Sequence, residues 1–481
     1  MDNSRGKRQE EVPRAAHDIL RNGTELSEPA SAETIVNSKE SVIYRLSETR
    51  ERKVECRCGM FRGCLAKVIP PGGLVSTTFN FASVCIGAGI LGLPAAANAT
   101  GLIMAVLYNM LFALFTTYSL YCIAVQMEKH NFRSMESMSF HLFGPNFRYV
   151  AAAIRFTNSF GSCIAFVISV GDVFRSIMRG GNVPEFFSSK SGTLVVTSLI
   201  WLFCMLPLCI PRSVNALRYI STLAISFIVY LVVVIVVHSS KNGLAENVKN
   251  IRLSGGPDDE QVHLFGTGNE ALAGPSVFLF AFLCQINSYE IYWAMPERSV
   301  SRFTLSASIA IGLCCILYVT TSIFGYLDFA GKTKGSVLLL YYPTEEPVLM
   351  VGYIGLVVKL CASYALVGLA ARNTFYHMVG WNLDTLQFWK HCICATLLAT
   401  ASLIFGLFIP NVNTAFGFVG SLSGALSGFV IPSLFMMYGG NWSLKTVGWF
   451  HYILTYAVLV VGVILVVVGT TATIYSAASS P

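Results

Sequence analysis

The chain has 481 residues, of which 54% are apolar and 12% are charged. An ordinary soluble domain carries about twice that charged fraction, so the composition excludes a conventional soluble enzyme. The apolar residues form runs of about 20, the length that crosses a bilayer as an α-helix. The formal charge of +7 does not indicate a nucleic-acid partner, because 13 of the 33 Lys and Arg lie in the first 72 residues and others flank the apolar runs.

The polar segment 1–73 contains no apolar core of a signal peptide, so we expect a disordered N-terminal tail. A transmembrane domain is predicted over residues 74–474, followed by a short tail at 475–481. Its eleven expected spans are 74–98, 101–126, 148–176, 192–210, 215–238, 272–296, 303–327, 347–371, 389–409, 412–437 and 447–474. The basic tail favours a cytoplasmic N-terminus, and an odd number of spans then places the C-terminus outside.

The first predicted span contains GAGILGLP, in which three glycines precede Pro94. This composition disfavours a continuous helix, so we expect a break near Gly87 to Gly89. A new helix start offers unpaired backbone N–H groups and the positive end of the helix dipole to an anionic group such as a carboxylate. Gly87, Ala88 and Gly89 are therefore predicted binding residues. The alternative is a kinked packing helix with small residues at a helix contact.

The sixth predicted span carries the polar sequence QINSYE at its centre, including Gln285, Asn287, Ser288 and Glu290. A charge at mid-bilayer costs about 2.5–3.5 kcal/mol on insertion scales. We expect this helix to be broken too, beside a water-filled cavity, because unwound backbone is tolerated only there. The alternative is a Glu290 that is protonated or paired with a structural cation.

Two interrupted spans, one opening each half of a ten-helix core, are typical of an inverted-repeat secondary transporter. The predicted fold class is therefore an all-α polytopic membrane protein with a five-plus-five inverted repeat, broken first and sixth helices, and one extra helix. A solute would bind between the broken helices at mid-membrane.

The sequence FNFASVCIGAGILGLP resembles the first-span signature of the amino acid/auxin permease family, and CQINSYEIYWAMPE resembles its sixth-span signature. Arg372 falls where that family has an arginine closing the eighth span. Gln285 and Glu290 stand where many members have His and Pro, a version similar to that of trypanosomatid members, which carry arginine, lysine or neutral amino acids. The resemblance covers the ten-helix core. It implies a LeuT-like fold and amino acid transport, usually coupled to protons or sodium.

Other polar residues within spans form a predicted gating and coupling set. Arg155 and Asp172 share one face of the third span and are expected to line a pathway or gate, or to hold helices in register. In the eighth span the Lys359 ammonium either replaces a transported cation or packs against Glu290 or a backbone carbonyl. The full set is Asn80, Arg155, Asp172, Gln285, Lys359 and Ser363.

A mid-membrane carboxylate can pair with a cationic side chain, so Glu290 favours basic amino acids, L-arginine before lysine. In the expected pose, the N–H groups near Gly87 to Gly89 bind the α-carboxylate, unwound carbonyls with Asn287 bind the α-ammonium, and Glu290 binds the distal charge. Ser288 is a further predicted binding residue. Alternatively, Glu290 is the proton-coupling acid of a symporter for neutral amino acids of the alanine or proline type.

The expected partners are the amino acid and the lipid bilayer, and no nucleic acid. We expect a monomeric transport unit that imports its solute at the plasma membrane, driven by the membrane potential and coupled to H+, without cofactor or metal. A membrane enzyme is disfavoured, because the eight His show no metal-ligand spacing. A sensor that signals through the N-terminal tail is an alternative from another class.

Overall fold

The computed structural model describes residues 73–179, 186, 189–211, 224–381, 386–409, 411–440 and 442–479. The predicted tail up to residue 72 lies outside the described residues, as do residues 480–481 of the predicted C-terminal tail. The other part of that tail is helical, since the last helix runs to Ser479.

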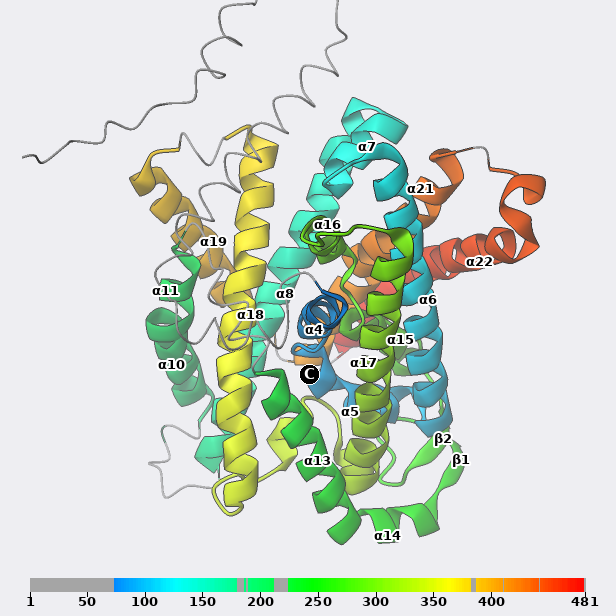
Figure 1. Cartoon of the computed structure of the whole chain (residues 1–481). Coiled ribbons are helices and arrows are strands. Elements are labelled where there is room, and N and C mark those ends of the chain that lie inside the picture. Colours follow the sequence, from blue (N-terminus) through cyan, green and yellow to red (C-terminus); the bar gives the residue numbers. More distant parts are fainter. Residues whose placement is uncertain are drawn as a thin grey trace, which may run out of the picture. The chain divides into compact units, whose positions relative to one another are not determined.

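The described elements follow the predicted spans. In chain order the helices are α4 (Leu74–Cys85), α5 (Gly89–Thr100), α6 (Leu102–His130), α7 (Met135–Phe143), α8 (Pro145–Arg179), α10 (Lys190–Ile200), α11 (Leu206–Cys209), α13 (Ile225–Lys241), α14 (Leu244–Asn247), α15 (Asn269–Ala281), α16 (Gln285–Trp293), α17 (Val300–Phe329), α18 (Pro347–Val379), α19 (Phe388–Phe408), α20 (Val412–Phe418), α21 (Ile431–Tyr438), α22 (Leu444–Ile464) and α23 (Thr470–Ser479) (Figure 1). Two short strands, β1 (Arg252–Gly255) and β2 (His263–Gly266), pair in parallel, with Arg252 opposite His263.

In this part of the chain, nine helical segments are long and apolar enough to cross a membrane. Two bent pairs, α4 with α5 and α13 with the helical turn after it, raise the number to eleven. The predicted all-α polytopic fold is therefore confirmed, and the protein is an integral membrane protein. The start of the fifth predicted span, residues 215–223, lies outside the described residues.

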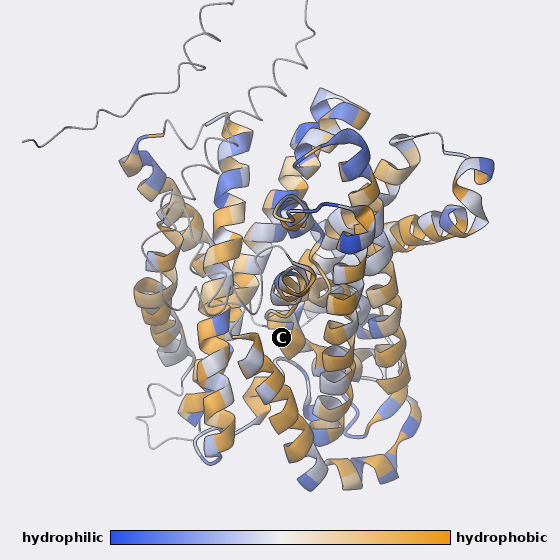
Figure 2. Ribbon diagram, in the orientation of Figure 1, coloured by the Kyte–Doolittle hydropathy of each residue, from blue (hydrophilic) through white to orange (hydrophobic). Residues whose placement is uncertain are grey.

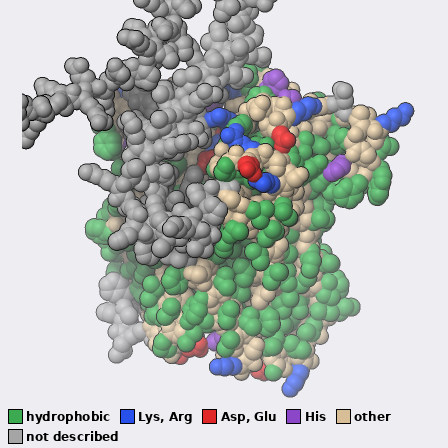
Figure 3. Space-filling model, in the orientation of Figure 1, with side chains coloured by type: hydrophobic (Ala, Val, Ile, Leu, Met, Phe, Trp, Pro, Cys, Tyr) green, Lys and Arg blue, Asp and Glu red, His purple; other side chains and the backbone are tan. Residues whose placement is uncertain are grey.

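Apolar side chains point outward over the middle of the helices. Met110 and Leu114 of α6 are each 58% exposed and Ile316 of α17 is 65% exposed, which suits lipid contact and not water. Hydrophobic side chains cover the middle of the face in Figure 3, while charged side chains gather toward its two ends. The ribbon coloured by hydropathy shows the same distribution along the helices (Figure 2).

The two half-helices of the first span are packed among the helices that form the centre of the fold. Helix α5 packs against α15 and α17, α4 packs against α17, and α18 lies along α8. This arrangement brings the beginning of the first half of the core against the beginning of the second half.

A buried carboxylate, that of Asp328 in α17, joins three segments near the end of this helix. His238 of α13 lies with Nδ1 2.7 Å from Asp328 Oδ2, and the hydroxyl of Tyr341 donates to the same oxygen at 3.0 Å. The other ring nitrogen of His238 lies 3.4 Å from a carboxylate oxygen of Glu346. The Asp328 side chain is 1% exposed, so its bonds must offset the loss of hydration.

Replacing Asp328 with alanine should lower the free energy of unfolding by about 1.5–3 kcal/mol, the range for hydrogen bonds to a charged group. The measurement is thermal unfolding of the purified protein in detergent. The matched control is Asp258→Ala, because the Asp258 carboxylate is 88% exposed although it lies 2.6 Å from Lys334 Nζ, and exposed pairs contribute little. Equal melting temperatures for the two variants would contradict the role given to Asp328.

Candidate functional site

The first span is broken where the glycines predict it. Helix α4 ends at Cys85, α5 begins at Gly89, and the two axes differ by 57°. The intervening residues are buried, and no side chain caps the start of α5. Of the backbone N–H groups in the first turn of α5, that of Leu91 donates to the Ala88 carbonyl at 3.0 Å, whereas those of Gly89 and Ile90 lie before the first intrahelical bond.

The second break lies in the sixth span but three residues earlier than the polar sequence. Helix α15 ends at Ala281 and α16 begins at Gln285, so QINSYE is wound into the first turns of α16. Its side chains satisfy the backbone at this start. Gln285 Oε1 accepts a hydrogen bond from the Cys284 N–H at 3.0 Å, and the Ser288 hydroxyl donates to the Gln285 carbonyl at 2.6 Å. The Nε2 atom of Gln285 is buried and has no hydrogen-bond partner.

The two breaks meet. At Gly89 an added Cβ would lie 2.9 Å from the Cα atom of Ala281, a closer approach than side chains make. The hydroxyl of Tyr318 in α17 lies 2.7 Å from the carbonyl oxygen of Cys85 and 3.0 Å from that of Ala281. Tyr318 is missed by sequence analysis, because a tyrosine in an apolar helix gives no local signal of a contact 233 residues away.

Lys359 of α18 contacts the last turn of α4. Its Nζ atom donates to the carbonyl oxygen of Ser83 at 2.9 Å and to the Ser83 hydroxyl at 3.1 Å. Of the expected partners, the backbone carbonyl is thus the one that the structure places here. Both Lys359 and Ser363, one turn further along α18, are buried.

Arg155 of α8 lies between two carboxylates. Its Nη1 atom is 3.2 Å from Glu136 Oε1, and its Nη2 atom is 3.9 Å from Glu290 Oε1. Burial alone would raise the pKa of Glu136 in α7, but the Arg155 guanidinium and a backbone hydrogen bond hold it below its ordinary value. The Glu136 side chain is 7% exposed and that of Glu290 is 45% exposed, so Glu290 is the more open partner.

Other residues of the predicted set are not brought together. Asp172 lies seventeen positions beyond Arg155 on α8, which is about 26 Å along a helix axis, so these two residues do not pair. Asn80 is half-buried within α4, and Asn287 is half-buried in α16. A shared helical face predicts the direction of a side chain but not its depth in the membrane.

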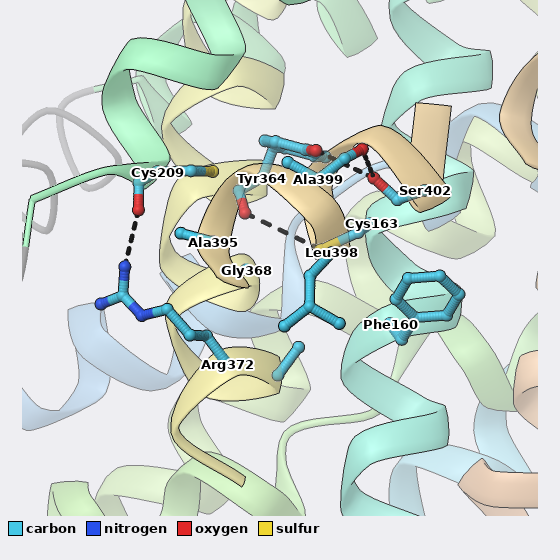
Figure 4. A pocket seen from close by; sticks show the side chains of 11 residues that line it. Phe160, Cys163, Cys209, Tyr364, Gly368, Arg372, Ala395, Leu398, Ala399 and Ser402 are labelled. Atoms are coloured by element: carbon cyan, nitrogen blue, oxygen red, sulfur yellow. Dashed lines mark hydrogen bonds between the residues drawn. The ribbon is translucent and has the colours of Figure 1, made fainter. Parts of the chain in front are cut away.

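A small cavity lies away from the breaks, between α8, α11, α18 and α19 (Figure 4). It has a volume of about 20 Å³, room for one or two water molecules. Arg372 lies at its edge and donates to the Cys209 carbonyl at 2.7 Å. Helix α18 continues to Val379, so Arg372 lies within the helix and does not close it. The lining residues are Phe160, Cys163, Cys209, Tyr364, Gly368, Ala371, Arg372, Ala395, Leu398, Ala399 and Ser402.

Replacing Lys359 with methionine should reduce amino acid uptake at least tenfold while the melting temperature changes by only a few degrees. Burial of an ammonium costs about as much as its hydrogen bonds return, so an apolar chain of similar length is tolerated for stability. The measurements are uptake into proteoliposomes and unfolding in detergent. In the matched control Ser83→Ala, the carbonyl contact stays and only the hydroxyl contact is lost, so less than a threefold change is expected. Unchanged uptake in Lys359→Met would show that the charge is dispensable.

The chain is similar to known amino acid transporters over most of its length. A model of the family described as "Transmembrane amino acid transporter protein" matches residues 70–475. The chain is 24% identical to "Amino acid transporter AVT6E" of Arabidopsis thaliana, over 84% of this chain and 83% of that protein. It is 24% identical to "Vacuolar amino acid transporter 5" of Schizosaccharomyces pombe over 76% and 84% of the two chains. It is 23% identical to "Sodium-coupled neutral amino acid symporter 2" of Danio rerio over 75% and 74%. The described residues form up to eleven spans, and the two helix breaks are in contact. Because the family model also matches nearly the whole described part, the chain belongs to the transmembrane amino acid transporter family.

Proposed function

We propose that this protein imports cationic amino acids, L-arginine before lysine, across the plasma membrane by alternating access, with its N-terminus in the cytoplasm. The observation that carries the proposal is the position of Glu290. Its carboxylate lies on α16, about one and a half turns after the helix begins at Gln285, and faces a guanidinium group at 3.9 Å. A carboxylate that accommodates the arginine side chain of the protein itself suits the arginine side chain of a solute.

The ends of the broken helices support a pose for the rest of the solute. The start of α5 at Gly89 has no side-chain cap, so its N–H groups and helix dipole suit an α-carboxylate. The unpartnered Nε2 atom of Gln285 adds a donor at the start of α16. Asn287 and Ser288, with the unwound carbonyls near the second break, would receive the α-ammonium.

Arg155 suggests how a cationic solute is accommodated beside Glu290. Its contact with Glu136 is the shorter one, at 3.2 Å against 3.9 Å to Glu290. A solute cation can therefore take the place of Arg155 at Glu290 while Arg155 keeps its pairing with Glu136.

The membrane potential supplies a sufficient driving force for a cation. One positive charge moving inward gains about 2.3 kcal/mol per 100 mV, and 1.4 kcal/mol is a tenfold ratio, so the potential alone concentrates the solute about 40-fold. The Nζ atom of Lys359 already occupies the Ser83 oxygens at the end of α4, which fits transport without a metal cation at that end. Coupling to protons is the further component that we propose.

A second candidate is a symporter of neutral amino acids. It is favoured by the same ion pair, because Arg155 already neutralises part of the charge on Glu290 in this structure. The Danio rerio relative, a sodium-coupled neutral amino acid symporter by name, points the same way. In that case Glu290 would take part in proton coupling.

The decisive measurement is uptake of a panel of radiolabelled amino acids into proteoliposomes, with and without an inside-negative potential and a pH gradient. Arginine should be accumulated, and the potential should increase its accumulation at least tenfold. Competition by alanine or proline as strong as that by arginine would refute the cationic preference. An unchanged accumulation when the pH gradient is collapsed would remove proton coupling.

Replacing Glu290 with glutamine should abolish arginine uptake, because the distal charge of the solute loses its partner. The matched control is Glu297→Gln, since Glu297 pairs with Arg302 at the surface and its side chain is 74% exposed. The control should transport normally, and both variants should reach the membrane in equal amounts. Full uptake by the Glu290 variant would exclude this residue from the site.

A further inference from the structure

We infer that Tyr318 is a positioning residue for transport, whose hydroxyl couples the two broken helices so that they move together. It contacts no part of the proposed solute pose. The inference goes beyond the proposed function, because it holds for whichever amino acid is carried.

The two acceptors of the Tyr318 hydroxyl are equivalent positions in the two breaks. Cys85 is the last residue of α4, and Ala281 is the last residue of α15. Their carbonyl oxygens lie 2.7 Å and 3.0 Å from the hydroxyl oxygen. One phenolic proton is thus shared between the C-terminal ends of two half-helices that belong to different halves of the core.

Carbonyl groups at these helix ends need hydrogen-bond donors from elsewhere in the protein. The last four carbonyls of a helix have no intrahelical partner, the bilayer core supplies no water, and a buried group without a partner costs about 1–3 kcal/mol. A single proton can bond fully to only one of the two carbonyls at a time. When one helix end moves away from the hydroxyl, its carbonyl is left without a donor in a place that water does not reach, so the two ends are favoured to stay with Tyr318 and to move together.

The tyrosine itself is held in place. It lies within the continuous helix α17 (Val300–Phe329) and is fully buried. The ring of Phe282, the first unwound residue of the second break, packs edge-on against it with centroids 5.0 Å apart. Helix α17 also packs along both α4 and α5, so it provides a fixed frame for the two breaks.

The position of the hydroxyl predicts which kinetic quantity depends on it. The hydroxyl binds the C-terminal ends, α4 and α15, whereas the solute would bind the N-terminal ends, α5 and α16. Loss of the hydroxyl should therefore slow the conversion between states and leave solute recognition nearly unchanged.

The test is Tyr318→Phe, which removes only the hydroxyl. The maximal uptake rate for the best-transported amino acid of the panel should fall at least tenfold, while KM changes less than threefold. The matched control is Tyr353→Phe in α18, because Tyr353 is also fully buried and donates to the Leu338 carbonyl at 2.7 Å. The control should keep its rate within threefold. Equal rates in the two variants, or a change confined to KM, would overturn the inference.

A second measurement does not need uptake by the variant. Cys85 ends α4 and Cys284 lies in the second break; both are buried, and their thiols contact each other. Their reaction with N-ethylmaleimide, followed by mass spectrometry, therefore reports the opening of the region where the breaks meet. Both should react several-fold faster in Tyr318→Phe than in Tyr353→Phe. In the unaltered protein, added amino acid should change both labelling rates in the same direction and by similar factors. Independent changes at the two cysteines would refute the coupling even if the variant failed to fold.

Discussion

A helix that is interrupted inside a bilayer must find partners for its backbone within the protein, and most of the site follows from this constraint. The structure treats the two kinds of helix end differently. The C-terminal ends at Cys85 and Ala281 share the hydroxyl of Tyr318, and the last turn of α4 also receives the ammonium of Lys359. The N-terminal end at Gly89 has no side-chain cap, whereas the Cys284 N–H at the start of α16 donates to Gln285 Oε1. The protein therefore satisfies the acceptors itself and leaves donors for an anionic group at the start of α5.

The charged clusters differ in how firmly they join the helices. Asp328 is buried with His238 and Tyr341, so its bonds are worth much more than those of an exposed pair. Glu290 lies 3.9 Å from Arg155 and is partly open to solvent, so this contact contributes little to stability. Helix α16 is thus held more weakly against α8 than α13 is held against α17, so the weaker of these two contacts lies beside the proposed binding site.

The spans and the first break could be predicted because they depend on local composition: apolar runs of sufficient length, and glycines that precede Pro94. The second break lies before the polar sequence and not within it. The side chains of Gln285 and Ser288 hydrogen-bond to the backbone there, so this sequence is helical although its polarity alone predicts an unwound segment. The grouping of Asp172 with Arg155 came from helical periodicity, which carries no information on depth. The role of Tyr318 could not be predicted from the sequence, since its contacts depend on how distant helices pack.

The close approach of Gly89 to Ala281 also limits which substitutions this sequence can accept. Backbone of one half lies directly against backbone of the other, and even a methyl group at position 89 would come within 2.9 Å of a Cα atom. No neighbouring side chain can yield to make room, as a flexible one would, because the obstacle is the chain itself. Position 89 therefore accepts no substitution without separation of the two halves, whereas lipid-facing positions such as Leu114 exchange freely among apolar residues. The tolerance of a position in this transporter is thus set by its distance from the neighbouring backbone, even where the residue has no side chain.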